Sequence, residues 1–76
     1  MIRKHSVSLH GHRTSFSLED AFFAELKALA TRNEVTLTEQ LRLIDDTRAP
    51  DVNLSSAIRL AVLSDMKTRL HDAGCA

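Results

Sequence analysis

The feature that most constrains this chain is an alternation of polar and apolar side chains along KHSVSLHGHRTSFSL, from Lys4 to Leu18. A period of two places successive side chains on opposite faces of a β-strand, as a half-buried strand requires. Gly11 interrupts the alternation, and a two-residue turn at His10-Gly11 keeps it in phase on both sides. The pattern predicts a β-hairpin. Because His-Gly is a weak turn signal, a flexible arm over residues 1–11 is the alternative.

The alternation in both strands of the predicted hairpin assigns the same kind of side chain to each face. A two-residue turn pairs Leu9 with His12 and Val7 with Thr14, and paired residues lie on the same face. The inner face is expected to hold Val7, Leu9, Thr14 and Phe16. The outer face is expected to hold six polar side chains: Lys4, Ser6, Ser8, Arg13, Ser15 and Ser17.

Three helices are predicted after the strands, over about 19–33, 37–47 and 54–72, because apolar residues recur there at three- and four-residue spacing. Two capping boxes mark the first two starts: Ser17 with Asp20, and Thr36 with Glu39. Asn53 or Ser55 is expected to cap the third helix, and Pro50 separates it from the second. Residues 1–76 are therefore predicted to form a single, mainly α domain with a short N-terminal β ribbon or hairpin.

Charge is unevenly distributed along a chain whose net charge is zero. Arg3, Lys4 and Arg13 precede the first acidic residue, Glu19, whereas residues 19–76 hold all ten acids against seven bases. A basic segment on a mildly acidic body can present a local positive face despite neutrality overall. The rival interpretation is a solvated, slightly basic terminus.

Cysteine usage and the start of the chain indicate a reducing compartment. Cys75 is the single cysteine, and one cysteine supplies neither an internal disulfide nor a thiolate metal site. Arg3 and Lys4 lead into alternating residues, not into an apolar block of about 7 to 15 residues, and no run approaches the roughly 18 needed for a membrane span. We expect a cytoplasmic, nucleoid-associated protein with no membrane contact.

The order of a strand with a polar outer face, a helix, a short turn and a second helix resembles the ribbon-helix-helix family of Arc- and MetJ-type repressors. The resemblance covers Arg13 to about Thr47, through RTSFSL, EDAFFAELKALA and TLTEQLRLI. The segments SVSLHGHRTSFSLEDAF and NLSSAIRLAVL are similar to a short bacterial branch of that family. The resemblance implies an intertwined homodimer in which strands of both protomers pair and enter the DNA major groove, with an extra C-terminal helix.

Base contacts are expected from the outer face of the ribbon, at Arg13, Ser15 and Ser17. A guanidinium can donate two hydrogen bonds to guanine, whereas serine hydroxyls donate or accept and discriminate weakly. If the hairpin forms, three residues of the first strand share this face: Lys4, Ser6 and Ser8. If it does not, Arg3 and Lys4 are expected to contact phosphates from an arm.

The resemblance also implies that the start of the second helix, at Thr36, Leu37 and Thr38, holds a DNA phosphate. Free amides and the helix dipole favour an anion there. Glu39 lies in the same turn and would repel that anion, so a simply well-capped helix is the alternative.

Metal binding and catalysis have weak signals. His5, His10 and His12 are candidate metal ligands, but neither a cysteine nor a carboxylate lies nearby in the sequence to complete a site. The adjacent carboxylates Asp45 and Asp46 have no predicted cleft beside them. We expect no cofactor and no enzymatic activity.

The sequence therefore predicts a sequence-specific, double-stranded-DNA-binding transcriptional regulator or repressor that acts as a homodimer on an approximately palindromic site. The third helix carries apolar residues at steps of four: Leu54, Ile58, Val62, Met66 and Leu70. This stripe is expected to finish the dimer core, or to join dimers into a higher assembly. The alternative function is a protein-protein interaction module or antitoxin that binds its partner through the third helix or the sheet face.

Overall fold

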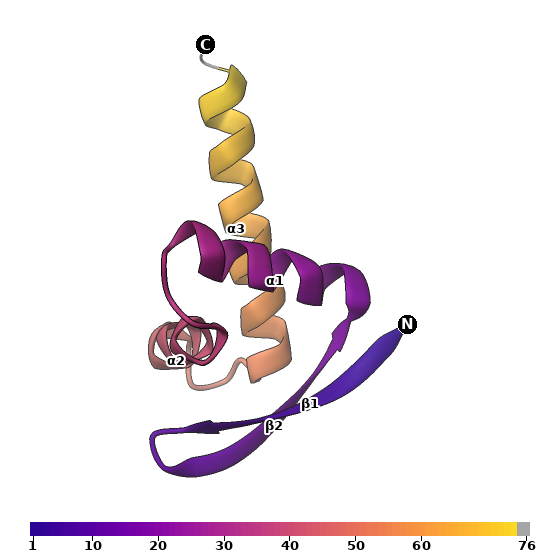
Figure 1. Ribbon diagram of the computed structural model, residues 1–76, viewed down its shortest axis with the longest axis vertical. Coiled ribbons are helices and arrows are strands. Elements are labelled where there is room, and N and C mark those ends of the chain that lie inside the picture. The colour runs from indigo at the N-terminus through magenta and orange to yellow at the C-terminus, as the bar shows by residue number, and fades with distance from the viewer. Residues whose placement is uncertain (75–76) are drawn as a thin grey trace.

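The computed structural model describes residues 1–74, and Cys75 lies outside them. Two strands and three helices follow one another along the chain: β1 Ile2–Leu9, β2 His12–Glu19, α1 Asp20–Arg32, α2 Leu37–Thr47 and α3 Leu54–Gly74. The predicted helix ranges differ from these by no more than two residues at any end. All three helices lie on one side of the hairpin, and α3 stands across it (Figure 1).

The hairpin forms as predicted, so residues 1–11 are a strand and turn and not an arm. β1 pairs antiparallel with β2, with Leu9 opposite His12 and Val7 opposite Thr14. At the turn, His10 (φ 53°) and Gly11 (φ 77°) are both left-handed. Two successive left-handed residues form the turn whose twist matches that of the flanking strands. The twist explains why a weak turn sequence still closes this hairpin.

The predicted cap of the first helix at Ser17 is wrong. β2 continues to Glu19, which occupies the N-cap position of α1 without a side-chain capping bond. Pairing with Lys4 holds Ser17 in extended backbone, and the Ser17 backbone N–H donates to Ser55 Oγ at 3.0 Å. Strand pairing therefore overrides the local capping preference, and the N-cap position of α1 moves two residues along the chain, from Ser17 to Glu19.

The starts of α2 and α3 follow local capping rules. Thr36 Oγ1 accepts a hydrogen bond from the Glu39 backbone N–H at 3.1 Å. Asn53 Oδ1 accepts one from the Ser56 N–H at 2.8 Å, so Asn53 caps α3 and the alternative, Ser55, does not. Ser55 is free to bond to β2 instead.

The core lies between the inner face of the hairpin and the three helices. Its buried side chains come from every element: Leu9, Phe16 and Leu18; Leu26; Leu41 and Ile44; Leu54, Ala57, Ile58 and Val62. The predicted stripe of α3 is buried only as far as Val62, and Met66 (38%) and Leu70 (75%) are exposed. The third helix is thus an integral part of the core in its first half. Within residues 1–74, no helix is long and apolar enough to cross a membrane.

Replacing Phe16 by Ala is expected to lower the free energy of unfolding by roughly 3 to 5 kcal/mol, because a buried ring leaves a cavity. Phe16 is only 4% exposed. Denaturant titration measures the change, and Ser15→Ala on the opposite face of β2 is the control. Equal stability of the two variants would place Phe16 outside the core.

The ion pair between Glu19 and Arg59 predicts a dependence of stability on acid pH. Hydrogen bonds from its own backbone and from Arg59, with Nε to Oε1 at 2.9 Å, lower the pKa of Glu19 below its ordinary 4.5. A lowered pKa stabilises the fold above pH 4.5, and the contribution disappears as the pH falls through the folded-state value. In urea titrations, the stability difference between the wild type and Glu19→Gln should shrink in acid. A difference independent of pH would contradict this role.

Candidate nucleic-acid interface

The outer face of the hairpin presents the six predicted polar side chains to solvent. All six are exposed: Lys4, Ser6, Ser8, Arg13, Ser15 and Ser17. They face one another across the ribbon in three pairs: Lys4 with Ser17, Ser6 with Ser15, and Ser8 with Arg13. We call this set the outer face; it contains two cations, four hydroxyls and no carboxylate.

Arginines form ion pairs with most of the carboxylates, which explains how a neutral chain has a positive face. Ion pairs join arginine to an acid at, among others, Arg3–Asp20, Arg48–Asp45, Arg59–Glu19 and Arg69–Glu25. Four lysine or arginine side chains of residues 1–74 have no carboxylate within ion-pair distance: Lys4, Arg13, Lys27 and Lys67. Two of these four lie on the outer face.

Arg3 is separate from this face. It pairs with Leu18 in the hairpin register, and its Nε donates to Asp20 Oδ1 at 2.9 Å. The predicted arm role of Arg3 assumed a free N-terminal segment, and strand pairing removes that freedom.

Both strands of the ribbon come from one chain. The resemblance implies that strands of two protomers pair, and within this chain β1 pairs with β2. At Ser17 the other edge of β2 is already bonded to α3: Ser55 Oγ accepts from the Ser17 N–H, and Arg59 Nη2 donates to the Ser17 carbonyl at 3.4 Å.

The start of α2 lies beside the ribbon. Leu37 and Thr38 line a cavity of about 130 Å³ together with Ser6 of β1, and Thr38 is exposed. The negative charge of Glu39 was expected to repel a phosphate at this site. Arg42 of the same helix pairs with Glu39, and its Nε donates to Glu39 Oε2 at 3.1 Å. This bond raises the pKa of Arg42 and partly neutralises Glu39.

The three N-terminal histidines do not converge on one point. His5 stacks between Phe16 and Phe23, with ring centroids 5.1 and 4.1 Å away. Its buried Nε2 has no hydrogen-bond partner within residues 1–74. His12 is exposed at the start of β2. The three residues serve the core, the turn and the surface separately.

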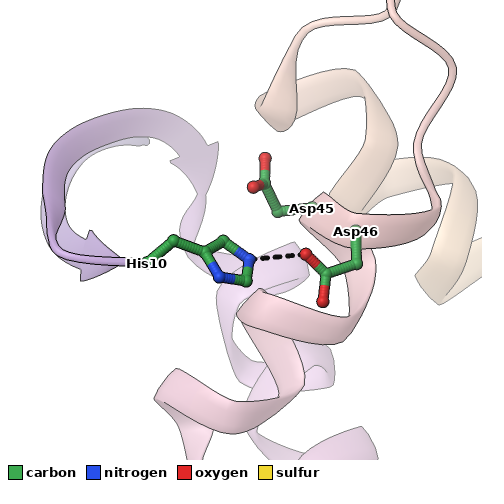
Figure 2. A group of neighbouring side chains, drawn as sticks. All are labelled: His10, Asp45 and Asp46. Atoms are coloured by element: carbon green, nitrogen blue, oxygen red, sulfur yellow. Dashed lines mark hydrogen bonds and ion pairs between the residues drawn. The ribbon is translucent and has the colours of Figure 1, made fainter.

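His10 has carboxylate neighbours that the sequence did not reveal. Its Nε2 lies 2.5 Å from Asp46 Oδ1, and one ligand atom from each of His10, Asp45 and Asp46 lies within 4.8 Å of the others (Figure 2). Arg48 already donates to Asp45 at 2.8 Å, and Arg42 lies 4.0 Å from Asp46. The group ties the hairpin turn to the end of α2.

Sequence reasoning missed the contacts that position the ribbon. Ser55 and Arg59 bond to β2 across 38 to 42 residues, and Asp46 meets His10 across 36. No local motif marks such pairs, because each forms only when separate elements pack together. The helices carry arginines and acids that could form ion pairs, but the sequence does not show which residue each of them contacts.

A family model described as a ribbon-helix-helix domain matches residues 2–66. The chain belongs to the ribbon-helix-helix family, whose members are generally DNA-binding regulators, typically dimeric and typically non-enzymatic. No curated protein and no solved structure matches the chain. The match includes β1 and the first half of α3, so both belong to this domain and are not appendages.

Proposed function

We propose that this protein is a sequence-specific transcriptional regulator that binds double-stranded DNA through the outer face of its hairpin. The observation that supports this most is the composition of that face: the unpaired cations Lys4 and Arg13, four small hydroxyls and no carboxylate. Strands about 4.8 Å apart form a ribbon that fits a major groove about 12 Å wide. The role places the protein on the nucleoid.

The side chains divide into two roles. Arg13 reads guanine with two hydrogen bonds, and Ser6, Ser8, Ser15 and Ser17 are short enough to let the ribbon approach base edges. Lys4 lies four residues along the ribbon from the Ser8–Arg13 pair, about 13 Å away, and contacts the phosphate backbone. Thr36, Leu37 and Thr38, at the start of α2, offer backbone amides to a phosphate beside β1.

A homodimer fits this function, because two hairpins related by a two-fold axis read the two halves of an approximately palindromic site. Association of dimers side by side would extend the bound site.

A protein-binding function is the second candidate, and an exposed apolar patch favours it. Leu60, Leu63 and Leu70 of α3 are all exposed, and an apolar patch can receive a partner helix. An antitoxin would combine this surface with the DNA-binding hairpin.

Selection from a random DNA pool across a salt series tests the DNA-binding proposal. Arg13→Ala is expected to weaken binding by roughly 1 to 3 kcal/mol at one guanine and to relax specificity there. Lys4→Ala should weaken binding to all sequences alike and reduce the salt slope by about 1. Neither variant should lower the melting temperature, because neither side chain packs in the core.

Arg69→Ala is the matched control, since it removes the same charge from the far part of α3. If Arg13→Ala and Arg69→Ala bind DNA equally well, the outer face is not the reading surface. If the wild type binds no DNA even at low salt, the protein-binding candidate replaces this proposal.

A further inference from the structure

The hairpin turn and the end of α2 bring three metal-ligating side chains together. His10 lies in the turn, and Asp45 and Asp46 lie at the end of α2. One ligand atom of each lies within 4.8 Å of the other two, and the imidazole reaches from the turn toward the helix (Figure 2). His10 and Asp46 are exposed and Asp45 is half-buried, so an ion in solvent can reach all three. We call these three residues the turn cluster.

The turn cluster is more than a pair of surface acids, because its nitrogen ligand comes from another element. His10 Nε2 lies 2.5 Å from Asp46 Oδ1, across 36 residues of chain. An imidazole is the commonest metal ligand in proteins. The fold therefore supplies the nitrogen donor that neighbouring residues in the sequence do not offer to Asp45 and Asp46.

The position of the two carboxylates on α2 favours a bound cation. The C-terminal end of a helix carries a partial negative charge, and acidic side chains in the last turn add to it. Asp45 and Asp46 both lie at this end of α2, Leu37–Thr47, whose last turn contains no basic residue. A cation beside them offsets both the helix dipole and the repulsion between adjacent carboxylates.

The neighbouring arginines leave one negative charge uncompensated. Arg42 donates to both carboxylate oxygens of Glu39 and lies 4.0 Å from Asp46. Arg48 donates to Asp45 Oδ1 at 2.8 Å, so the other oxygen of Asp45 is open to an ion. Three carboxylates thus lie beside two guanidinium groups. The remaining charge is balanced by a proton on the imidazole or by a metal ion.

The donor set selects the kind of metal ion. One imidazole nitrogen with carboxylate oxygens suits borderline divalent ions such as Zn²⁺, whereas Mg²⁺ and Ca²⁺ prefer about six or more oxygens. Tetrahedral zinc, with bonds of about 2.0 to 2.2 Å, places its ligand atoms about 3.4 Å apart. This separation lies between the 2.5 Å of the His10–Asp46 contact and the 4.8 Å limit of the turn cluster. Small side-chain rotations are enough to reach it.

We propose that the turn cluster binds a divalent transition-metal ion of the zinc class. Its protein ligands are His10 Nε2 and one carboxylate oxygen from each of Asp45 and Asp46, and water completes the shell. The ion takes the place of the proton between Nε2 and Asp46 Oδ1, and the imidazole stays neutral with its proton on Nδ1. The bound ion clamps the hairpin turn to α2.

The clamp lies at the end of the ribbon that carries Arg13. Ser8 and Arg13 form the pair next to Leu9 and His12, which flank the turn. An ion that fixes the turn also restricts the guanidinium that reads guanine, so zinc should tighten DNA binding. This consequence rests on the proposed function, whereas the metal site itself does not.

Calorimetric titration of the full chain with zinc chloride tests the site. A Cys75→Ser background removes the one thiol that could bind zinc elsewhere. This parent should bind one zinc ion per chain, and His10→Ala and Asp46→Asn should each weaken binding by roughly tenfold or more. His12→Ala is the matched control, because it removes an exposed imidazole outside the turn cluster. Equal weakening by His10→Ala and His12→Ala, or no zinc binding by the parent at millimolar zinc, would overturn the proposal.

Two measurements on the unsubstituted ligands keep the test decisive if a variant fails to fold. Zinc should shift the imidazole resonances of His10 in NMR spectra and leave those of His12 in place. Cobalt bound at the site should give the intense visible absorption of a four-coordinate ion, and excess Mg²⁺ should not displace it. A weak octahedral cobalt spectrum, or displacement by Mg²⁺, would show non-specific attraction of cations and overturn the site.

DNA binding measured with zinc and with a chelator separates this site from the proposed function. On a DNA sequence selected by the wild type, zinc should lower the Kd by roughly fivefold or more, and His10→Ala should remove that response. Zinc binding without DNA binding would reject the proposed function and leave the metal site in place. Arg13-dependent DNA binding by a protein that binds no zinc would do the reverse.

Discussion

The apolar inner face of the hairpin is the constraint on which the rest of this structure depends. A two-stranded ribbon is at best marginally stable in water and needs a covering layer. Phe16 and Leu18 are almost completely buried, and the helices that bury them include α3, whose Ile58 is fully inaccessible. The Ser17 N–H donates to Ser55 and the Ser17 carbonyl accepts from Arg59, and these two hydrogen bonds hold α3 against the edge of β2. The helix that extends the minimal fold is therefore part of its stabilisation.

The ion pairs between arginines and carboxylates affect the distribution of surface charge more than they affect stability. Exposed ion pairs contribute little to stability, because solvent screens them. They do neutralise most of the acids of the helices, and Lys4 and Arg13 on the outer face keep their charges unpaired. A zero net charge is thus compatible with a surface suited to DNA, since attraction depends on where the unpaired charges lie.

The hairpin places residues of two strands on one surface. β1 pairs with β2 of the same chain, so side chains from both strands share the outer face. Hydrogen bonds of Ser17 with Ser55 and Arg59 fix the position of this face relative to α3.

The sequence by itself determined the hairpin, the helices and the two faces of the ribbon. Alternation from Lys4 to Leu18, the helical spacing and the Thr36 cap are local patterns, and local backbone preferences act on them whatever the rest of the chain does. The tertiary structure decided that Ser17 stays in the strand, that Asn53 caps α3 while Ser55 bonds to β2, and that His10 meets Asp46. The Ser17–Ser55 and His10–Asp46 contacts join residues 36 or more positions apart. Such residues become neighbours only when burial of the core brings their elements together.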